Sequence, residues 1–386
     1  GIVRNVLEQI RKVNVPEHIA KSLLREEGIV TPEGEVARDA RAAGEIARRL
    51  NRRVAIKAQI PAGKRGKSGG IAFATTPEDA QTKAEALIGS EIAGHRVDAV
   101  LVEAAADIES ELYVAILNDG SSRGPLLLFS REGGIEIEDQ GEKILRVPLD
   151  IRTGLDAATA REIAGDDALA AVMQKMYERF IALDCELLEI NPLARERSGR
   201  YVALDCKMTI DDSSRPRQKE LFSRVENATG PLGTSLEQRA RDAGLYFIEL
   251  DGEVGVLANG AGLTMTTLDA VHLHGGKPAN FLEIGGEAYT KATIALELVL
   301  SNPRVRSVLV NFCGAFARTD VMAEGVAQAW ETLRPHVPFF FSIHGTGEER
   351  AIEIVRERLG IEPFAVMDDA VKAAIAAARE PAGVRA

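Results

Sequence analysis

Residues 252–286, GEVGVLANGAGLTMTTLDAVHLHGGKPANFLEIGG, are the stretch from which the fold of this chain is most directly predicted. An apolar run at 254–258 predicts a strand, and the glycine-rich turn after it leads into a helical pattern that begins near Leu263. A second apolar run follows at 280–282. Strands that alternate with helices of about 10–15 residues are typical of a parallel, doubly wound sheet.

The same alternation continues toward the C-terminus. Further apolar runs predict strands at 307–312, 339–343 and 363–366. Helical patterns accompany them, beginning near Thr290, Asp320, Glu348 and Asp369. Ligands of such sheets collect outside the carboxyl ends of the strands, where helix N-termini offer free N–H groups and a dipole that favours anions. We therefore expect a ligand-binding edge at the glycine-rich loops that follow these strands.

The first half of the chain predicts a mixture of strands and helices. Val6, Ile10 and Val13, and later Ile19 and Leu23, recur at helical spacing, so helical stretches are expected between residues 6 and 50. The other expected elements are a helix at 77–89, a mostly helical stretch at 156–184, strands at 53–59, 99–103, 111–117, 125–129, 186–190 and 201–207, and a loop at 191–200. Residues 211–244 are polar and contain Pro and Gly, which predicts a linker.

The composition predicts a folded protein of two or three domains, since 386 residues exceed one ordinary core. The net charge of −11, from 47 Lys and Arg against 58 Asp and Glu, argues against nucleic acid or an anionic membrane as partner. No apolar run reaches the roughly 18 residues of a membrane span. The three cysteines, Cys185, Cys206 and Cys313, lack metal-ligand spacing and indicate a reducing, cytoplasmic compartment.

A cationic, glycine-rich loop follows the first predicted strand. Lys57 lies near the end of that strand, and residues 62–70 contain Lys64, Arg65 and Lys67 among four glycines. Such a loop can bring backbone amides and charges to the oxygens of a polyphosphate. The residue order matches neither GxxxxGK[ST] nor GxGxxG, and the alternative is a solvated basic hairpin tip.

Oxygen ligands suited to Mg²⁺ occur on the predicted strand pair. Glu189 and Asn191 are two residues apart, so they are expected on the same face of a strand, and Asp205 lies on the partner strand. Mg²⁺ binds few protein oxygens and keeps water and phosphate as its other ligands. The alternative is an Asn-Pro turn with charged rims.

Two further carboxylates, Glu103 and Glu111, follow or begin apolar strands. Strand ends of this kind are places where adenine and ribose are read. The alternative is a pair of solvated strand-end charges.

Six ordered segments carry a resemblance over residues 15–380. They are VAIKAQIPAGKRGKSGGI, VLVEAAADIESELYVAIL, LLEINPL, ALDCKM, the stretch quoted first, and VRSVLVNFCGAFARTDVMAEGV. Together they resemble the β subunits of succinyl-CoA synthetase (succinate–CoA ligase), whose relatives include malate–CoA ligase and the large subunit of citryl-CoA synthetase. The resemblance implies an ATP-grasp domain of two subdomains at 1–228, a linker at 229–243 and a flavodoxin-like CoA-ligase domain at 244–386.

The resemblance also implies roles for particular residues. Lys57 and Arg65 match phosphate-binding residues, with Lys64 and Gly66 in the same loop, and Glu103 and Glu111 match nucleotide-binding carboxylates. Asn191 and Asp205 match Mg²⁺ ligands, and Glu189 matches the residue that meets a phosphohistidine of the partner. The organic acid is expected at Asn259, Gly314, Ala315, Ala317, Arg318 and Thr319.

The implied reaction is that of an acid–thiol ligase of the ADP-forming, succinate–CoA ligase type in the tricarboxylic acid cycle. ATP or GTP phosphorylates a histidine of an α-type partner, the phosphoryl group passes to a small carboxylic acid, and CoA displaces phosphate to give a thioester. CoA is expected to bind mainly to the partner. Only His344 of the six histidines here lies at a predicted strand end before a glycine loop; it is either a nucleophile, a substrate contact or a structural loop histidine.

Several positions depart from the family pattern. Pro61 and Lys64 replace a His and a Gly, Ala315 replaces a Gly, and Ser342 replaces an Arg. These changes leave hydroxy acids and tricarboxylic acids as alternatives to succinate. Two other functions are weighed: a stand-alone carboxylate–amine ligase, disfavoured by the second domain, and a non-catalytic nucleotide-binding regulatory subunit, disfavoured because the phosphate and Mg²⁺ residues are all present.

Overall fold

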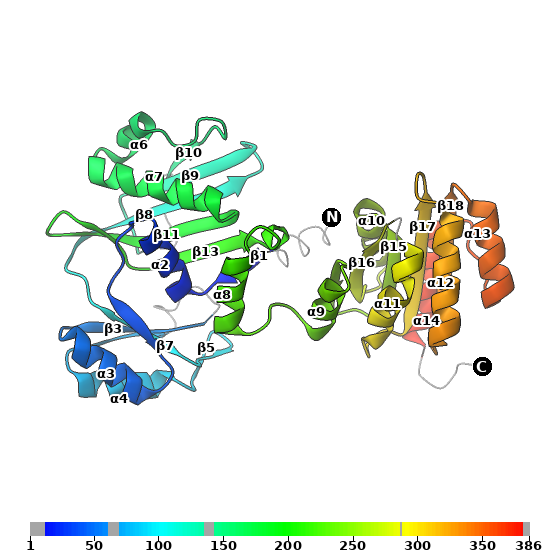
Figure 1. The fold of residues 1–386 in the computed structure, drawn as a ribbon, viewed down its shortest axis with the longest axis horizontal. Helices are drawn as coiled ribbons and strands as arrows, with labels where there is room; N and C mark the ends of the chain where they lie inside the picture. The colour runs from blue at the N-terminus through cyan, green and yellow to red at the C-terminus, as the bar shows by residue number, and fades with distance from the viewer. Residues whose placement is uncertain (1–11, 61–68, 135–142, 286–287, 381–386) are drawn as a thin grey trace. The chain divides into compact units, whose positions relative to one another are not determined.

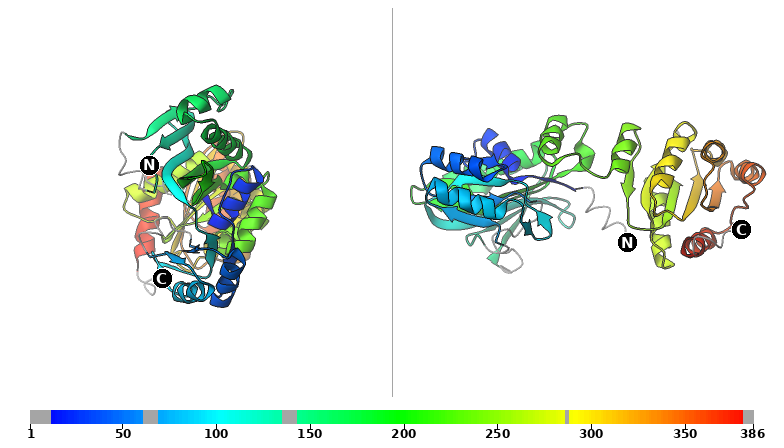
Figure 2. Two further views of the ribbon diagram at one scale, coloured as in Figure 1. Left: turned by 90° about the vertical axis from the view of Figure 1, so that its left-hand side faces the viewer. Right: turned by 90° about the horizontal axis from the view of Figure 1, so that it is seen from below.

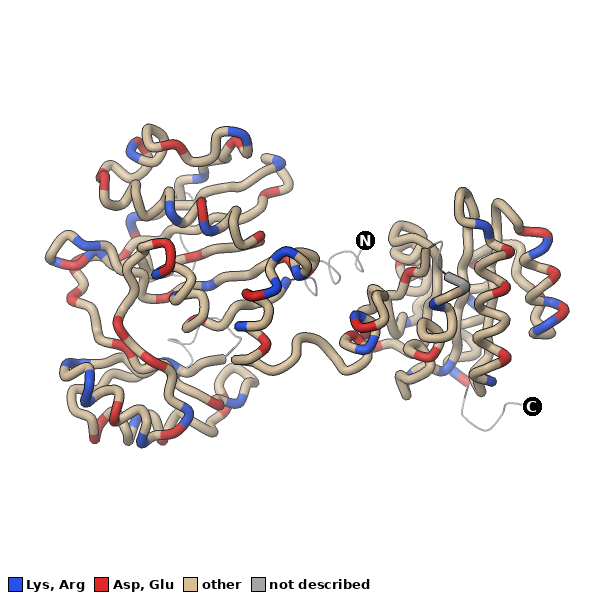
Figure 3. Tube along the Cα trace, viewed as in Figure 1, with Lys and Arg blue, Asp and Glu red and all other residues tan. Residues whose placement is uncertain are grey.

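The computed structural model describes residues 12–60, 69–134, 143–285 and 288–380. The chain divides into two compact units, with residues 11–230 in one and residues 231–386 in the other. Each unit is described by itself below. Lys and Arg positions are interspersed with Asp and Glu positions in both units (Figure 3).

The first unit contains a small antiparallel sheet covered on one face by two helices (Figure 1). Its strands are β2 (Gly34–Ala37), β3 (Val54–Ala58), β4 (Ile71–Ala74) and β7 (Val100–Ala104), in the order β2-β7-β3-β4. The helices are α3 (Ala40–Leu50) and α4 (Pro77–Leu87). The side chains of Asp39 and Thr76 cap the two helix N-termini. Asp39 accepts the backbone N–H of Ala42 and Thr76 accepts that of Asp79, which fixes where each helix begins. A short hairpin, β5 (Glu91–Ile92) and β6 (His95–Arg96), precedes β7.

The two faces of this small sheet differ in character. Ile56 and Ala58 of β3 and Val102 of β7 pack against α3 and α4 in an apolar core. Because successive strand residues point to opposite faces, Lys57 and Glu103 project from the other face. Two of the residues predicted for the nucleotide, Lys57 and Glu103, therefore lie on that face.

A seven-stranded antiparallel sheet completes the first unit. Its order is β1-β13-β11-β8-β9-β10, and β12 pairs with one end of β11. The strands are β1 (Lys12–Val15), β8 (Ile108–Asp119), β9 (Gly124–Ser130), β10 (Leu145–Pro148), β11 (Cys185–Glu196), β12 (Tyr201–Ala203) and β13 (Cys206–Asp211). The accompanying helices are α2 (Glu17–Glu26), α6 (Ala157–Ala164), α7 (Asp167–Ala182), the 3-10 turn η2 (Asp212–Ser214) and α8 (Lys219–Thr229).

Three expectations for the first unit are wrong. Val13 lies in strand β1, where it alternates in burial with its neighbours, and not in a helix. Residues 34–37, inside the region where helical stretches were expected, form strand β2. Gly34 allows a close approach to β7, since a Cβ there would lie 2.4 Å from the carbonyl oxygen of Val102. Most of the expected loop 191–200 is strand, since β11 runs on to Glu196 beside β8 and β12.

The second unit is a five-stranded sheet with helices on both faces (Figures 1 and 2). The order is β14-β16-β15-β17-β18, parallel except for the edge strand β14. The strands are β14 (Phe247–Glu249), β15 (Val254–Asn259), β16 (Asn280–Ile284), β17 (Ser307–Gly314) and β18 (Phe339–Gly345). The helices are α9 (Ser235–Asp242), α10 (Ala261–Leu273), α11 (Ala288–Ser301), α12 (Thr319–Leu333), α13 (Glu348–Ile354) with the π-helical turn η3 (Val355–Leu359), and α14 (Met367–Arg379).

The predicted βα series is confirmed for four of its five strands. Residues 363–366 do not form a full strand: Phe364 makes a single bridge with Ser342, and Pro363 has no N–H to extend the ladder. The short antiparallel strand β14 was not expected, and residues 235–242, inside the expected linker 229–243, form helix α9.

The connections of the second sheet create a switch point between its two central strands. Strand β15 leads through α10 to β16 on one side, and β17 leads through α12 to β18 on the other side. Helices α10 and α14 contribute to one core, whereas α9, α11, α12 and α13 contribute to the core on the opposite face. The loops after β15 and β17 therefore diverge at their carboxyl ends, which is where open α/β sheets bind ligands.

Candidate functional site

Lys57 is held in a network of buried contacts. Its ammonium lies 2.9 Å from Glu103 Oε2 and 3.4 Å from Glu17 Oε1, and it donates to the backbone carbonyl of Leu204. Leu204 joins β12 to β13 of the large sheet, whereas Lys57 belongs to the small sheet. Lys57 is therefore a direct link between the two sheets of the first unit.

A second lysine completes this network. Lys21 on α2 lies 2.8 Å from Glu17 Oε1, one helical turn away, and 2.6 Å from Glu103 Oε1. The exposed fractions of Lys21, Glu103, Glu17 and Lys57 are 1%, 2%, 6% and 7%. Four charged side chains, two of each sign, are thus enclosed together, and we call them the charge quartet.

The quartet keeps Lys57 charged. Burial by itself would lower the pKa of Lys57, but the carboxylates of Glu17 and Glu103, together with the charge of Asp205, outweigh burial and raise that pKa above its ordinary value. Lys57 is therefore a permanent cation at neutral pH, as a phosphate-binding residue needs to be.

The predicted Mg²⁺ ligands lie on neighbouring backbone. The N–H of Asn191 donates to the carbonyl of Asp205 at 3.2 Å, and Asn191 Oδ1 accepts the N–H of Gly134 at 2.8 Å. The N–H of Gly133 in turn donates to the carbonyl of Glu111 at 2.8 Å. These hydrogen bonds bring the predicted residues of β8 and β11 and the start of β13 to one place.

Gly134 has to be glycine at this place. Its φ is +70°, and a Cβ on it would lie 2.4 Å from Glu111 Oε2. The Glu111 carboxylate therefore lies against the backbone of Gly134, next to Asn191.

Glu189 projects from β11 on the same face of the sheet as Tyr113 of β8. The Tyr113 hydroxyl donates to Glu189 Oε2 at 3.1 Å, and Tyr113 is buried. One carboxylate oxygen of Glu189 is thereby oriented by a rigid aromatic side chain.

Three predicted nucleotide residues, Lys64, Arg65 and Gly66, lie outside the described residues. The structure does bring together Lys57 with Glu103, and Asn191 with Asp205 and the backbone of Glu111. The chemistry of this arrangement is a paired cation beside amide and carboxylate oxygens between two sheets, which suits a polyphosphate with a hard divalent ion.

In the second unit, Asn259 bridges the switch point. Its side chain donates to the carbonyl of Cys313 at 2.9 Å and accepts the N–H of Cys313 at 2.8 Å, so it joins the ends of β15 and β17. Cys313 is exposed and stands opposite His344 in the register of β17 and β18. A cysteine and a histidine therefore stand on neighbouring strands at the carboxyl edge of the sheet, where Asn259 also lies.

The loop from Gly314 to the start of α12 is held by hydrogen bonds to the backbone of Thr346. Thr319 donates its N–H and its hydroxyl to the carbonyl of Thr346, both at 2.9 Å, and Thr346 N–H donates to the Gly314 carbonyl. A Cβ at Gly314 would lie 2.7 Å from that Thr346 carbonyl. Ala315 is exposed at the carboxyl edge and Ala317 is half-buried beside it.

Arg318 is exposed and pairs with Asp320 at 2.9 Å. Hydrogen bonds from Arg318 hold the pKa of the Asp320 carboxyl below its ordinary value. The cation at this helix start is thus already partly neutralised, whereas the backbone N–H groups of α12 face the same edge.

Comparison with known proteins identifies a different domain family in each of the two units. Residues 14–195 match the ATP-grasp domain family, and residues 257–377 match the CoA-ligase family. The chain is 39% identical over 383 residues to a Gemmatimonas aurantiaca protein named succinate–CoA ligase (ADP-forming) subunit beta, covering 94% of this chain and 98% of that one. A protein of the same name from Rubrobacter xylanophilus is 40% identical over 380 residues, with 94% and 98% covered.

The chain belongs to the family of ADP-forming succinate–CoA ligase β subunits. The predictions of this family, of the ligase class and of an ATP-grasp domain followed by a CoA-ligase domain are therefore confirmed. A solved structure of ATP citrate lyase from Methanothrix soehngenii, in complex with citrate and coenzyme A, covers 95% of this chain and 100% of its own at a TM-score of 0.70. At 22% identity this likeness shows the fold alone.

Two residues of this family member escaped the sequence reasoning. Glu17 and Lys21 stand at the spacing of the buried positions Ala20 and Leu24, on the inner face of an amphipathic helix. The sequence pattern that could have predicted them is a pair of opposite charges at i and i+4 on the apolar face of a helix. Such charges need partners inside the protein.

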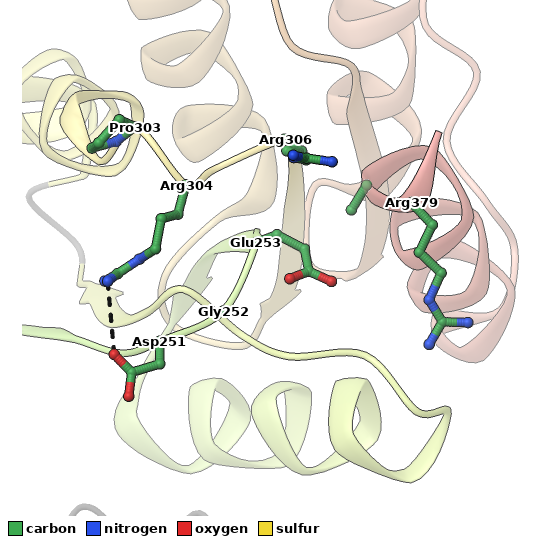
Figure 4. A pocket seen from close by; sticks show the side chains of 8 residues that line it. Asp251, Gly252, Glu253, Pro303, Arg304, Arg306 and Arg379 are labelled. Carbon is green, nitrogen blue, oxygen red and sulfur yellow. Dashed lines mark ion pairs between the residues drawn. The ribbon is translucent and has the colours of Figure 1, made fainter. Parts of the chain in front are cut away.

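Each unit also has a hollow lined by described residues. The hollow of the second unit, of about 490 Å³, is lined by Asp251, Glu253 and the three arginines Arg304, Arg306 and Arg379 (Figure 4). It lies at the amino ends of β15 and β17, opposite to the edge that holds Asn259. The other, of about 600 Å³, lies between α2, β7 and α8 and touches Lys21 and Glu103. Among the described residues, no helix is long and apolar enough to span a membrane.

Proposed function

We propose that this β-family chain binds the Mg-nucleotide in its first unit and the organic acid at the switch point of its second unit. The observation that supports the first assignment is the meeting of Lys57 and Glu103 from the small sheet with Leu204 and Asp205 from the large one. The proposed partner is an α-type subunit that binds CoA and carries the phosphohistidine.

The residues present fit Mg²⁺. Asn191 offers an amide oxygen, Asp205 a carboxylate, and their backbones are hydrogen-bonded to each other at 3.2 Å. No group of three or more His, Cys, Asp or Glu side chains suited to a metal occurs within the described residues, which is compatible with an ion that takes most of its ligands from phosphate and water. The ion would neutralise phosphate charge during transfer.

The remaining steps rest on side chains of this chain and on the partner. Lys57 and the predicted Lys64 and Arg65 would hold the phosphates in line, and Glu189, oriented by Tyr113, would accept a hydrogen bond from the partner imidazole. The terminal phosphoryl group would pass from the nucleotide to the partner imidazole, with the nucleoside diphosphate as leaving group, and from the imidazole to the acid carboxylate. The CoA thiolate would then displace phosphate from the acyl phosphate to give the thioester. Asn259 and residues 314–319 would hold the acid next to the helix start of α12.

The test is thioester formation by the chain co-expressed with its α-type partner, with MgATP or MgGTP, CoA, and succinate, malate or citrate as the acid. We expect turnover with one acid and loss of at least a hundredfold in Lys57→Met. Lys83→Met, which removes a half-exposed lysine paired with Asp79 on α4, is the matched control and should keep full activity. A folded complex that binds nucleotide but makes no thioester from any acid would favour the regulatory alternative.

A further inference from the structure

The ammonium of Lys57 has no unused donor in the quartet. A lysine ammonium has three N–H groups, and Lys57 has three acceptors: the carboxylates of Glu103 and Glu17 and the carbonyl of Leu204. A phosphate oxygen can bind Lys57 only by replacing one of them. The contact to Glu17, at 3.4 Å, is the longest ion pair in the quartet and therefore the weakest held.

Moving the Lys57 ammonium away from Glu17 or Glu103 would leave that carboxylate with less positive charge beside it. Glu17 and Glu103 are enclosed, and a buried carboxylate that loses its cation is strongly destabilised. The exchange of a carboxylate for a phosphate oxygen therefore depends on what else neutralises Glu17 and Glu103.

Lys21 contacts both carboxylates at short distances. It lies 2.8 Å from Glu17 Oε1, and 2.6 and 2.9 Å from the two oxygens of Glu103. These contacts are shorter than the contact that Lys57 makes with Glu17, and Lys21 lines the hollow between α2 and α8.

We infer that Lys21 is a positioning residue for nucleotide binding: it neutralises Glu17 and Glu103 so that Lys57 can exchange Glu17 for a phosphate oxygen. The inference rests on the proposed function, because it assumes that Lys57 binds phosphate. Glu17 is the temporary partner of Lys57, and Lys21 is the cation that stays. Neither Glu17 nor Lys21 needs to touch the nucleotide.

The experiment measures the Kd for Mg-ADP by calorimetry on the full chain, with the urea midpoint measured in parallel. Lys21→Met should raise the Kd at least tenfold, because Lys57 is then the remaining cation of the quartet beside two buried carboxylates. Lys21→Arg should stay within about threefold of the wild type, and Lys83→Met is again the matched control. The expected tenfold change corresponds to about 1.4 kcal/mol.

Two further variants separate positioning from simple loss of packing. Glu17→Gln removes the carboxylate that competes for Lys57, so it should bind Mg-ADP at least as tightly as the wild type. The double variant Glu17→Gln with Lys21→Met removes one charge of each sign and should recover at least half of the loss, on a logarithmic scale, caused by Lys21→Met. A purely structural role predicts no recovery, since the double variant lacks more contacts than the single one.

The possible outcomes are distinct. Wild-type affinity in Lys21→Met, weakened binding in Glu17→Gln, or no recovery in the double variant would each overturn the inference while leaving the nucleotide site intact. If Lys21→Met does not fold, the affinity of Glu17→Gln still decides, because the inference requires that it bind Mg-ADP at least as tightly as the wild type. If the wild type fails to bind Mg-ADP, or if Lys57→Met binds as tightly as the wild type, the proposed nucleotide site itself is wrong.

Discussion

Replacing Asn259 by alanine removes the two hydrogen bonds that join the ends of β15 and β17 across the switch point. Both are of good length, at 2.9 and 2.8 Å, and both end on the backbone of Cys313, one residue before the loop 314–319. Each such hydrogen bond contributes about 0.5–1.5 kcal/mol, so the pair holds the loop by about 1–3 kcal/mol.

The expected kinetic effect follows from that free energy. If acid binding requires the loop in its present position, the apparent affinity falls in proportion to the population of that state. A loss of about 1–3 kcal/mol corresponds to a rise of roughly 5- to 150-fold in the KM for the acid. The KM for ATP should not change, because the residues that we assign to the nucleotide belong to the other unit.

The assay is steady-state thioester formation at saturating MgATP and CoA with the acid varied. The matched control is Asn118→Ala, which removes a 3.4 Å hydrogen bond from an exposed asparagine to the Cys185 carbonyl in the first unit. Asn118→Ala should leave the KM for the acid unchanged. A KM for the acid within twofold of the wild type in a folded Asn259→Ala enzyme would refute the argument.

Two further predictions concern the second unit and the thiols. Asn280 is buried and its side chain bonds both backbone groups of Val256, so Asn280→Leu should lower the free energy of unfolding by about 2–6 kcal/mol, measured by urea denaturation; a loss below 1 kcal/mol would contradict this account. Burial raises the pKa of the Cys185 thiol to about 12, so at pH 8 roughly one molecule in ten thousand carries that thiolate. Iodoacetamide should therefore label exposed Cys313 in the native protein, more slowly when the acid is bound, and labelling of Cys185 at a similar rate would contradict the prediction.

Periodicity predicted the second unit well because its strands are buried on both faces. Runs such as 307–312 are apolar without interruption, and a parallel strand between two layers of helices requires such a run. The strand β14 escaped because it is three residues long and lies at an edge. Residues 363–366 look like a strand in sequence, yet tertiary pairing stops at Phe364.

Reasoning from single motifs was less effective in the first unit. Glycine is common in turns, but at Gly34 the missing side chain allows a close approach between β2 and β7. Asn191 was expected at the start of a loop, but β11 continues through it and pairs with β12 and β8 again from Leu193. In both positions a long-range backbone contact decides the local structure, and no window of sequence contains that contact.

The candidate site shows the same division between what touches a ligand and what holds it. Lys57, Asn191 and Asp205, which we propose as ligands of the nucleotide and Mg²⁺, stand in recognisable motifs because a ligand constrains residue type and spacing together. Glu17 and Lys21 stand in no such motif, since their constraint is only to balance charge inside the protein. Yet an enclosed Lys57 with two carboxylates cannot be understood without them: the charge that a phosphate would meet is set by all four residues of the quartet. For this β-family chain, the residues that govern how readily the cation exchanges partners therefore lie on a helix that the nucleotide motifs do not include.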